Sequence, residues 1–428
     1  MKSNSKYFPE LRAYLETVPL IDCHDHSRVC GPKYTDPMSI LTEDYLLDDL
    51  HSASSDSEIE IIKDTSLGIE QRWPVFEKAW KRTCHTGCAQ VTKLALKKFY
   101  GIEELTLDAL KRVESNPLRL DDEKVFEDIL DQANIVVRLE DVVGEIDEIK
   151  QVVDGTLKIT PRGRLVVHLT PFTEVCDHDT IQKIAGTIGK TVSTLDEYVN
   201  ICKELFEAYK RFGIVAFKNA SAYVRTLKYD APDKAKAEKT FNMIMSGDQC
   251  DCEQLKPLSD YLFHQAIQTA REMELPIQIH TGHLAEMRND IVRANAIGLT
   301  EIIDTYRDVR FDLFHANWPY SGEILFLAKN YPNAAIDFCW ANMLDPVYCQ
   351  NMFKQVVSSV PHGKIHGYGS DFSGFADRAW AHASIAKDNI AIALADMADI
   401  EYITEAEAKQ IAYDWLFANP NKFYNLGL

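Results

Sequence analysis

The chain has 428 residues, of which 46% are hydrophobic and 26% charged, a composition typical of a globular protein with a large core. Its net charge of −19 argues against binding to nucleic acid or to an anionic membrane surface. The first residues carry no apolar run typical of a signal peptide, and no stretch is apolar enough to predict a membrane span. The 10 cysteines form no paired Cys-x-x-Cys pattern, so we expect reduced thiols and a cytoplasmic protein.

The first predicted strand begins near residue 18 and runs directly into His24-Asp25-His26. Because side chains alternate between the two faces of a strand, His24 and His26 point the same way and Asp25 points the other way. Two imidazoles on one face at a strand end suit a divalent metal. Arg28 joins the same face if the extended geometry continues for two more residues.

Residues 38–130 differ from the rest of the chain. They are rich in helix formers and in periodic apolar positions, for example Trp73, Phe76 and Trp80, and they contain no strong strand pattern. We therefore predict a helical insertion after the first strand.

From residue 134 onward, short apolar, β-branched runs alternate with amphipathic stretches. The runs predict strands at 135–138, 165–169, 214–218, 277–280, 309–315, 334–338 and 365–369, and the clearest helices are expected at 195–212, 258–274, 284–296, 321–330 and 404–418. Such alternation is typical of βαβ units and a parallel sheet. With the opening strand the count is eight, which predicts an α/β fold, a TIM-type (β/α)8 barrel. We expect residues 1–428 to form a single domain with the insertion inside it.

Polar residues follow several of these strands: Lys218, His280, His315 and Asp371. The carboxyl ends of barrel strands converge on one face, where active sites are built. A buried carboxylate such as Asp371 needs a cation or a hydrogen-bond donor. The strand count therefore predicts a metal site in which His280 and Asp371 complete the histidine pair of the first strand.

This ordered set of residues resembles the amidohydrolase superfamily of metal-dependent barrels over most of the chain. The local sequences His280-Thr-Gly282 and Gly369-Ser-Asp371 are most similar to its amidohydrolase 2 branch. The helical insertion resembles that of the uronate isomerases, which belong to the same superfamily.

The resemblance implies that His24, His26, His280 and Asp371 are metal ligands, and that Asp371 also acts as a general base on metal-activated water. His315 either binds a second metal or polarises a substrate carbonyl as an acid–base group. Lys218 either is carboxylated and bridges two metals or holds a substrate oxygen as a free ammonium. We expect one divalent ion, zinc first with manganese, iron and nickel as alternatives, and a second ion only if Lys218 is carboxylated.

The substrate is expected to be a small acid. The guanidinium groups of Arg28 and Arg225 can each hold a carboxylate through two hydrogen bonds, although each residue could equally be structural. The aromatic side chains of Trp318 and Tyr320 are expected to wall the pocket.

Hydrolysis of a small amide, ester or lactone is the first functional hypothesis. Decarboxylation or uronate isomerisation at the same site is the alternative, and a non-catalytic metal-binding barrel is the third. A homo-oligomer is compatible with each of them.

Overall fold

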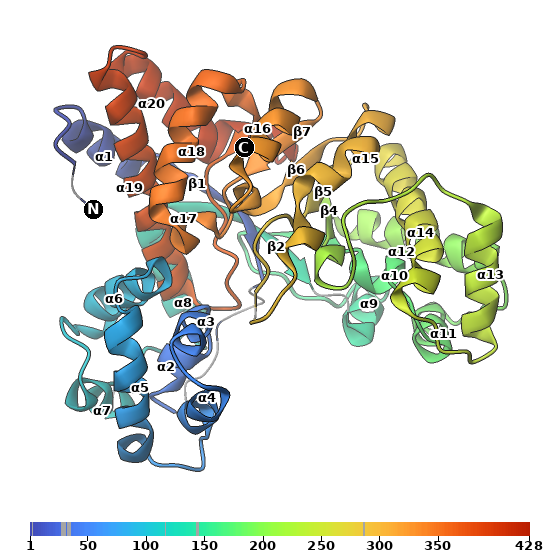
Figure 1. Ribbon diagram of the computed structural model, residues 1–428, viewed down its shortest axis with the longest axis horizontal. Coiled ribbons are helices and arrows are strands. Elements are labelled where there is room, and N and C mark those ends of the chain that lie inside the picture. Colours follow the sequence, from blue (N-terminus) through green and yellow to red (C-terminus); the bar gives the residue numbers. More distant parts are fainter. Residues whose placement is uncertain (2, 27–30, 32–35, 116, 143–144, 286) are drawn as a thin grey trace. The chain divides into compact units, whose positions relative to one another are not determined.

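The computed structural model describes the chain except residues 2, 27–30, 32–35, 116, 143–144 and 286 (Figure 1). The chain divides into two compact units. Unit 1 comprises Met1–Arg138, Ala285–Asn289 and Phe338–Ala418, and unit 2 comprises Leu139–Leu284, Asp290–Asp337 and Asn419–Leu428. The expectation of a single domain stays a prediction.

Eight strands form one sheet in chain order, which confirms the predicted strand count. Their bounds are β1 (Leu20–Asp25), β2 (Ile135–Val142), β3 (Gly163–His168), β4 (Ala216–Asn219), β5 (Ile277–Ile279), β6 (Phe311–Leu313), β7 (Ala334–Asp337) and β8 (Ile365–His366). Each was expected from a short apolar run, because a strand buried on both faces is apolar throughout rather than alternating.

In unit 2, strands β3 to β7 are parallel and pair in sequence. Phe217 of β4 pairs with Ile277 of β5, and Ile277 pairs in turn with Phe311 of β6. The helices and short helical turns of this unit are α9 (Ile146–Val153), α10 (Thr170–Thr173), α11 (His178–Gly186), α12 (Leu195–Phe212), η1 (Ser221–Tyr223), α13 (Lys234–Met245), α14 (Cys252–Glu272), η2 (Ile291–Ala294), η3 (Ala296–Leu299), α15 (Thr300–Thr305), η4 (Phe314–Asn317), α16 (Ser321–Asn330) and α21 (Asn419–Phe423).

In unit 1, β1 lies between the start of β2 and the segment that follows β8. The amide of Leu20 donates to the carbonyl of Asn134 (2.8 Å), and the amide of Cys23 donates to the carbonyl of Tyr368 (3.2 Å). These backbone hydrogen bonds bring the His24–His26 pair beside the chain that leads to Asp371.

The long helix α19 (Ala376–Asp399) is the hub of unit 1, and helices α1, α6, α8, α18 and α20 pack against it. It is rich in alanine and almost wholly buried, and small side chains let neighbouring helices approach closely. None of the described helices is long and apolar enough to cross a membrane. The other helices of this unit are α1 (Phe8–Thr17), α2 (Ser39–Thr42), α3 (Leu46–Ser52), α4 (Asp56–Lys63), α5 (Ile69–Thr83), α6 (Gly87–Tyr100), α7 (Leu107–Ser115), α8 (Glu123–Ala133), α17 (Ala341–Leu344), α18 (Pro346–Ser359), η5 (His362–Lys364), α20 (Glu405–Tyr413) and the π-helical turn η6 (Asp414–Ala418).

The predicted helical insertion is confirmed. Helices α2 to α8 follow one another between β1 and β2, with no strand among the described residues of that stretch (Figure 1, blue to cyan). On α5 the side chains of Trp73, Phe76 and Trp80 are buried and their rings pack in a row. The helical spacing of these three residues therefore reflects one buried helix face.

The prediction of a helix at 284–296 is wrong. The structure instead has the two 3₁₀ turns η2 and η3 in this region, and the regular helix α15 begins only at Thr300. The side chain of Asp290 accepts a hydrogen bond from the amide of Val292 (3.1 Å), and that of Asn295 accepts one from the amide of Ile297 (3.1 Å). Such local side-chain bonds to the backbone compete with helix formation.

Candidate active site

Unit 1 brings together three of the predicted metal ligands. The Nε2 atoms of His24 and His26 lie 3.5 and 3.2 Å from Oδ1 of Asp371. His24 is fully buried, and His26 is 25% exposed. β1 and the residue that follows it supply the two imidazoles, and the segment after β8 supplies the carboxylate, so the three groups come from distant parts of the chain.

These distances fit a shared divalent metal. Ligands bound to an ion at about 2.0–2.1 Å in a tetrahedral arrangement lie about 3.3 Å from one another. Two imidazole nitrogens and a carboxylate oxygen suit zinc, and also manganese, iron and nickel. The residues present in unit 1 thus provide three of the positions that such an ion needs.

The helical insertion adds a residue that the sequence analysis did not single out. The Tyr45 hydroxyl, at the start of α3, donates a hydrogen bond to the backbone carbonyl of Asp371 (2.7 Å). A cavity of about 280 Å³ lies here, lined by Asp371 and by insertion residues that include Tyr45, Leu47, Glu43 and Asp48. No local pattern predicts this contact, because it joins residues more than 300 positions apart in the chain.

Two buried acids of β1, Asp22 and Asp25, contact Ser370, the residue before Asp371. Asp22 Oδ1 accepts a hydrogen bond from the amide of Ser370 (2.7 Å), and Asp25 Oδ2 accepts one from the Ser370 hydroxyl (2.9 Å). Arg138 Nη1 lies 3.7 Å from Asp25 Oδ2. Burial, followed by the nearby charge of Asp25, raises the pKa of Asp22 well above its usual value. This arrangement was not foreseen, and the expected direction of the Asp25 side chain stays a prediction.

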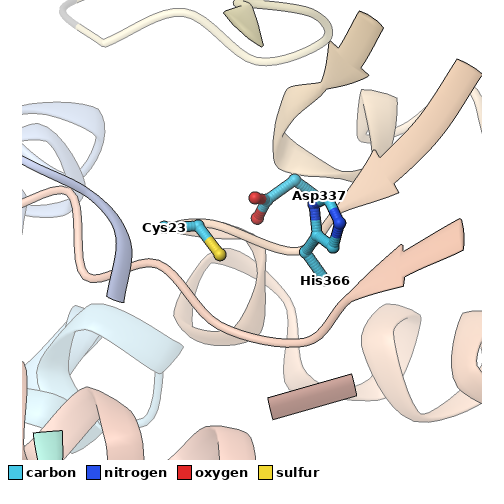
Figure 2. A group of neighbouring side chains, drawn as sticks. All are labelled: Cys23, Asp337 and His366. Atoms are coloured by element: carbon cyan, nitrogen blue, oxygen red, sulfur yellow. The ribbon is translucent and has the colours of Figure 1, made fainter. Parts of the chain in front are cut away.

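Unit 1 also contains two other buried side chains whose atoms could bind a metal ion, those of Cys23 and His366. The Sγ atom of Cys23 and a ring nitrogen of His366 lie within 4.8 Å of each other. Figure 2 shows Cys23 of β1 and His366 at the end of β8, with the Asp337 side chain that ends β7 also drawn. Cys23 and His366 are fully buried, so substrate does not reach them.

Unit 2 brings together two further predicted residues, His280 after β5 and His315 after β6. Their ring nitrogens, Nδ1 of His280 and Nε2 of His315, lie 3.1 Å apart. Nε2 of His280 lies 2.7 Å from the backbone carbonyl oxygen of His283 and, when protonated, donates a hydrogen bond to it. That bond would leave Nδ1 of His280 as the lone-pair atom, a common way to orient a metal-binding imidazole.

His315 sits on an unusual backbone. His315, Ala316 and Asn317 all have positive φ angles (61°, 46° and 51°), a region that non-glycine residues rarely occupy. Oδ1 of Asn317 accepts a hydrogen bond from the amide of Ala296 (2.9 Å), which helps to hold the turn. Gly282 approaches the same turn so closely that a Cβ atom there would lie 2.6 Å from the backbone of Asn317. Strained backbone of this kind is concentrated at functional sites.

Lys218 is almost fully buried at the end of β4, and its Nζ atom lies 4.4 Å from the centroid of the Phe314 ring. Tyr223, which the sequence analysis did not identify, packs edge-on against His280 with ring centroids 4.8 Å apart. Trp318 packs in the same way against His283 (5.3 Å). Tyr320 is half-buried at the start of α16. The catalytic role of Lys218 and the substrate-binding roles of Trp318 and Tyr320 stay predictions.

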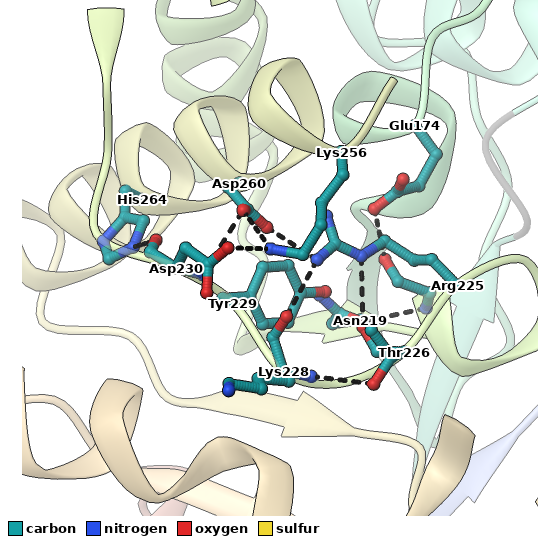
Figure 3. A network of polar contacts seen from close by, with 11 residues as sticks. Glu174, Asn219, Arg225, Thr226, Lys228, Tyr229, Asp230, Lys256, Asp260 and His264 are labelled. Atoms are coloured by element: carbon teal, nitrogen blue, oxygen red, sulfur yellow. Dashed lines mark hydrogen bonds and ion pairs between the residues drawn. The ribbon is translucent and has the colours of Figure 1, made fainter. Parts of the chain in front are cut away.

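Arg225 belongs to a network of polar contacts that surrounds the loop after β4 (Figure 3). Its Nη2 donates to Oδ1 of Asp260 on α14 (2.6 Å), and its guanidinium lies 4.3 Å from the centroid of the Tyr229 ring. Lys256 also pairs with Asp260 (2.6 Å). These contacts favour a structural role, and the substrate role of Arg225 stays a prediction. Arg28, the other predicted carboxylate-binding residue, lies outside the described residues.

An α/β sheet of eight strands in chain order, with histidine and aspartate side chains just after β1, β5, β6 and β8, defines a class of metal-dependent barrel enzymes. The chain belongs to the amidohydrolase family, because the family model of that description matches residues 198–426.

Solved structures with the same fold confirm the predicted (β/α)8 barrel. Uronate isomerase from Thermotoga maritima has a TM-score of 0.80 at 14% identity, covering 98% of each chain. Glucuronate isomerase from Caulobacter crescentus has a TM-score of 0.74 at 18% identity, covering 99% of this chain and 94% of that one. A protein from Lactobacillus casei provisionally named a metal-dependent hydrolase has a TM-score of 0.69 at 17% identity, covering 97% and 98%.

Among curated proteins, the chain is similar to Protein fluG of Emericella nidulans, with 25% identity over 224 residues. The match covers 50% of this chain and 26% of fluG. The chain thus spans about a quarter of the length of this relative.

Proposed function

We propose that this amidohydrolase-family enzyme is a metal-dependent isomerase that interconverts the aldose and ketose forms of a sugar acid. The observation that carries the proposal is the likeness to the uronate isomerase of Thermotoga maritima, which extends over 98% of the chain and so includes the helical insertion. The insertion supplies one wall of the cavity beside Asp371.

In this proposal His24, His26 and Asp371 hold the metal, and the role of His280 as a ligand stays a prediction from the sequence. A bound divalent ion supplies Lewis acidity toward the substrate carbonyl and the neighbouring hydroxyl. Asp371 takes the proton from C2 of the aldose and returns it to C1, while the hydroxyl proton at C2 moves to the oxygen at C1. For that second proton, His315 stays the acid–base group that the sequence predicts.

The charged residues that line the cavity beside Asp371 limit which end of a sugar acid can lie in it. Its described lining residues include the carboxylates of Glu43 and Asp48 and contain no lysine or arginine. A sugar carboxylate in this cavity would meet like charges, which disfavours binding. We therefore propose that the hydroxylated end of the substrate lies against these carboxylates. Arg28, which lies outside the described residues, stays the first candidate for binding the substrate carboxylate.

The test is incubation of the metal-supplemented protein with D-glucuronate and D-galacturonate in D₂O, followed by NMR. We expect ketose to form and deuterium to enter at the carbon that receives the proton. Asp371→Asn should abolish the conversion. The proposal would be refuted if none of the sugar acids tried gave either ketose or deuterium exchange.

Hydrolysis of a small amide, ester or lactone is a second candidate. It is favoured by the likeness to the Lactobacillus casei protein. The acidic lining of the cavity also suits a neutral amide, ester or lactone better than an anionic substrate. A panel of amides and lactones, run with the same metal supplements, separates the two reactions because only hydrolysis takes up water.

A further inference from the structure

A carboxylate oxygen of Asp22, in unit 1, accepts backbone hydrogen bonds from both segments that carry predicted metal ligands, β1 and the segment after β8. Oδ1 of Asp22 accepts hydrogen bonds from the amide of Ser370 (2.7 Å) and from the amide of His24 (3.3 Å). His24 is a predicted ligand, and Ser370 immediately precedes Asp371. Asp22 is fully buried, so water does not compete for either bond.

A second bond fastens the same turn. The Ser370 hydroxyl donates to Oδ2 of Asp25 (2.9 Å), and Asp25 is buried beside the guanidinium of Arg138. Ser370 is therefore bound through its backbone and through its side chain, in both cases to acids of β1. The amide of Asp371 then donates to the carbonyl of His24 (2.9 Å).

The turn needs this support because Asp371 has a φ angle of +59°. The left-handed region is unfavourable for residues with a Cβ atom, and a turn held only by its own backbone would relax out of it. Relaxation would rotate the Asp371 side chain away from Nε2 of His24 and His26, which now lie 3.5 and 3.2 Å from its Oδ1.

We propose that Asp22 and Ser370 are positioning residues that direct the Asp371 carboxylate toward the imidazoles of His24 and His26, so that the ligands are assembled before an ion binds. The inference rests on the proposed metal site. Neither residue touches substrate or metal; each acts through Asp371. Partners that orient metal ligands commonly contribute about 10- to 100-fold to metal affinity.

The substitutions follow from the atoms involved. Ser370→Ala removes the hydroxyl bond to Asp25 and keeps the backbone. Asp22→Leu removes the shared acceptor at similar volume. Asp22→Asn keeps an oxygen at the Oδ1 position, so the shared acceptor remains. Oδ2 of Asp22 has no hydrogen-bond partner among the described residues, so replacing it with an amide nitrogen breaks no hydrogen bond there. Tyr368→Phe is the control, because it removes one buried hydrogen bond, to the carbonyl of Ala379 (2.8 Å), from the same strand end.

The readout is zinc affinity of the full-length chain, measured by competition with a chromophoric chelator, with folding checked by urea unfolding in EDTA. We expect Ser370→Ala and Asp22→Leu each to weaken zinc binding about 10-fold or more. Asp22→Asn and Tyr368→Phe should stay within about threefold of the wild type, which is below that effect. If Asp22→Leu does not fold, Ser370→Ala decides alone.

Two results would overturn the inference while leaving the metal site intact. The first is zinc affinity of the wild-type level in the folded Ser370→Ala and Asp22→Leu chains. The second is an equal loss in Tyr368→Phe, which would indicate general loosening of the core. A wild-type chain that binds neither zinc nor manganese would instead refute the metal-dependent function, and the positioning role with it.

Discussion

The ion pair of Arg225 and Asp260 allows the role of Arg225 to be tested directly. The two side chains are 9% and 5% exposed, and their charged atoms lie 2.6 Å apart. Removing one member of a buried pair leaves the other charge uncompensated and commonly costs about 3–5 kcal/mol. Lys256 remains 2.6 Å from Asp260 in an Arg225→Met variant and offsets part of that cost. We therefore expect a loss of about 3 kcal/mol, at the lower end of that range.

The assay is urea unfolding of Arg225→Met, Asp260→Asn and the double variant. If the pair is structural, the double variant is more stable than the sum of the single losses predicts, by about 1 kcal/mol or more. Arg307→Met is the matched control. Its partner Asp304 also lies 2.6 Å away, but the Arg307 side chain is 76% exposed. Exposed pairs contribute about 0–1 kcal/mol, so this variant should be nearly as stable as the wild type.

Kinetics complete the test once a substrate is known. A structural Arg225 predicts that Asp260→Asn and Arg225→Met impair activity to a similar degree. A substrate-binding Arg225 predicts a raised KM in Arg225→Met alone. A stability loss below about 1 kcal/mol in Arg225→Met, no greater than that of an exposed pair, would refute the structural reasoning.

Three further predictions concern unit 1 and the metal ion proposed to bind there. A Cβ atom at Gly87 would lie 1.7 Å from the carbonyl oxygen of Met343, so Gly87→Ala should lower the unfolding free energy by about 1–3 kcal/mol or more, as measured in urea. Burial lowers the pKa of His382 to about 4, so its contribution to stability is present above the ordinary histidine value of about 6.5 and is lost as the pH falls toward 4. Between pH 7 and pH 5 the wild type should lose about 2 kcal/mol more than His382→Leu, and equal losses would contradict this. Zinc at 100 times its Kd should stabilise the wild type by about 2.7 kcal/mol, an effect that EDTA reverses and that Asp371→Leu lacks.

The features that could be predicted from the sequence are those that local patterns encode. Apolar runs gave all eight strands, and the alternation of side chains placed His24 and His26 on one face. The position of Asp371 just after the last strand predicted its meeting with that pair, because strand ends of a barrel converge. The helix expected at 284–296 failed because its polar residues cap turns as readily as they fit a helix face.

Contacts between distant residues could not be predicted in this way. Arg225 lies in a loop and carried a recognisable chemistry, but its partner Asp260 lies 35 residues further on, in helix α14. The bond from Tyr45 to Asp371 spans most of the chain. Periodicity specifies which face a residue occupies, not which residue of another element it meets, so both contacts require the fold.

The backbone angles at His315 and Asp371 were equally invisible to the sequence, and they bear most closely on function. A left-handed residue with a Cβ atom costs about 1–2 kcal/mol, which surrounding contacts must offset. Around Asp371 those contacts come from buried acids, and around His315 from Asn317 and the close approach of Gly282. A relaxed turn would let each side chain sample several directions. A strained turn that is held from several sides fixes one direction, so little reorganisation remains when charge develops on the substrate. The roles proposed for Asp371 and His315 would give the cost in stability at these two positions a functional reason under either candidate reaction.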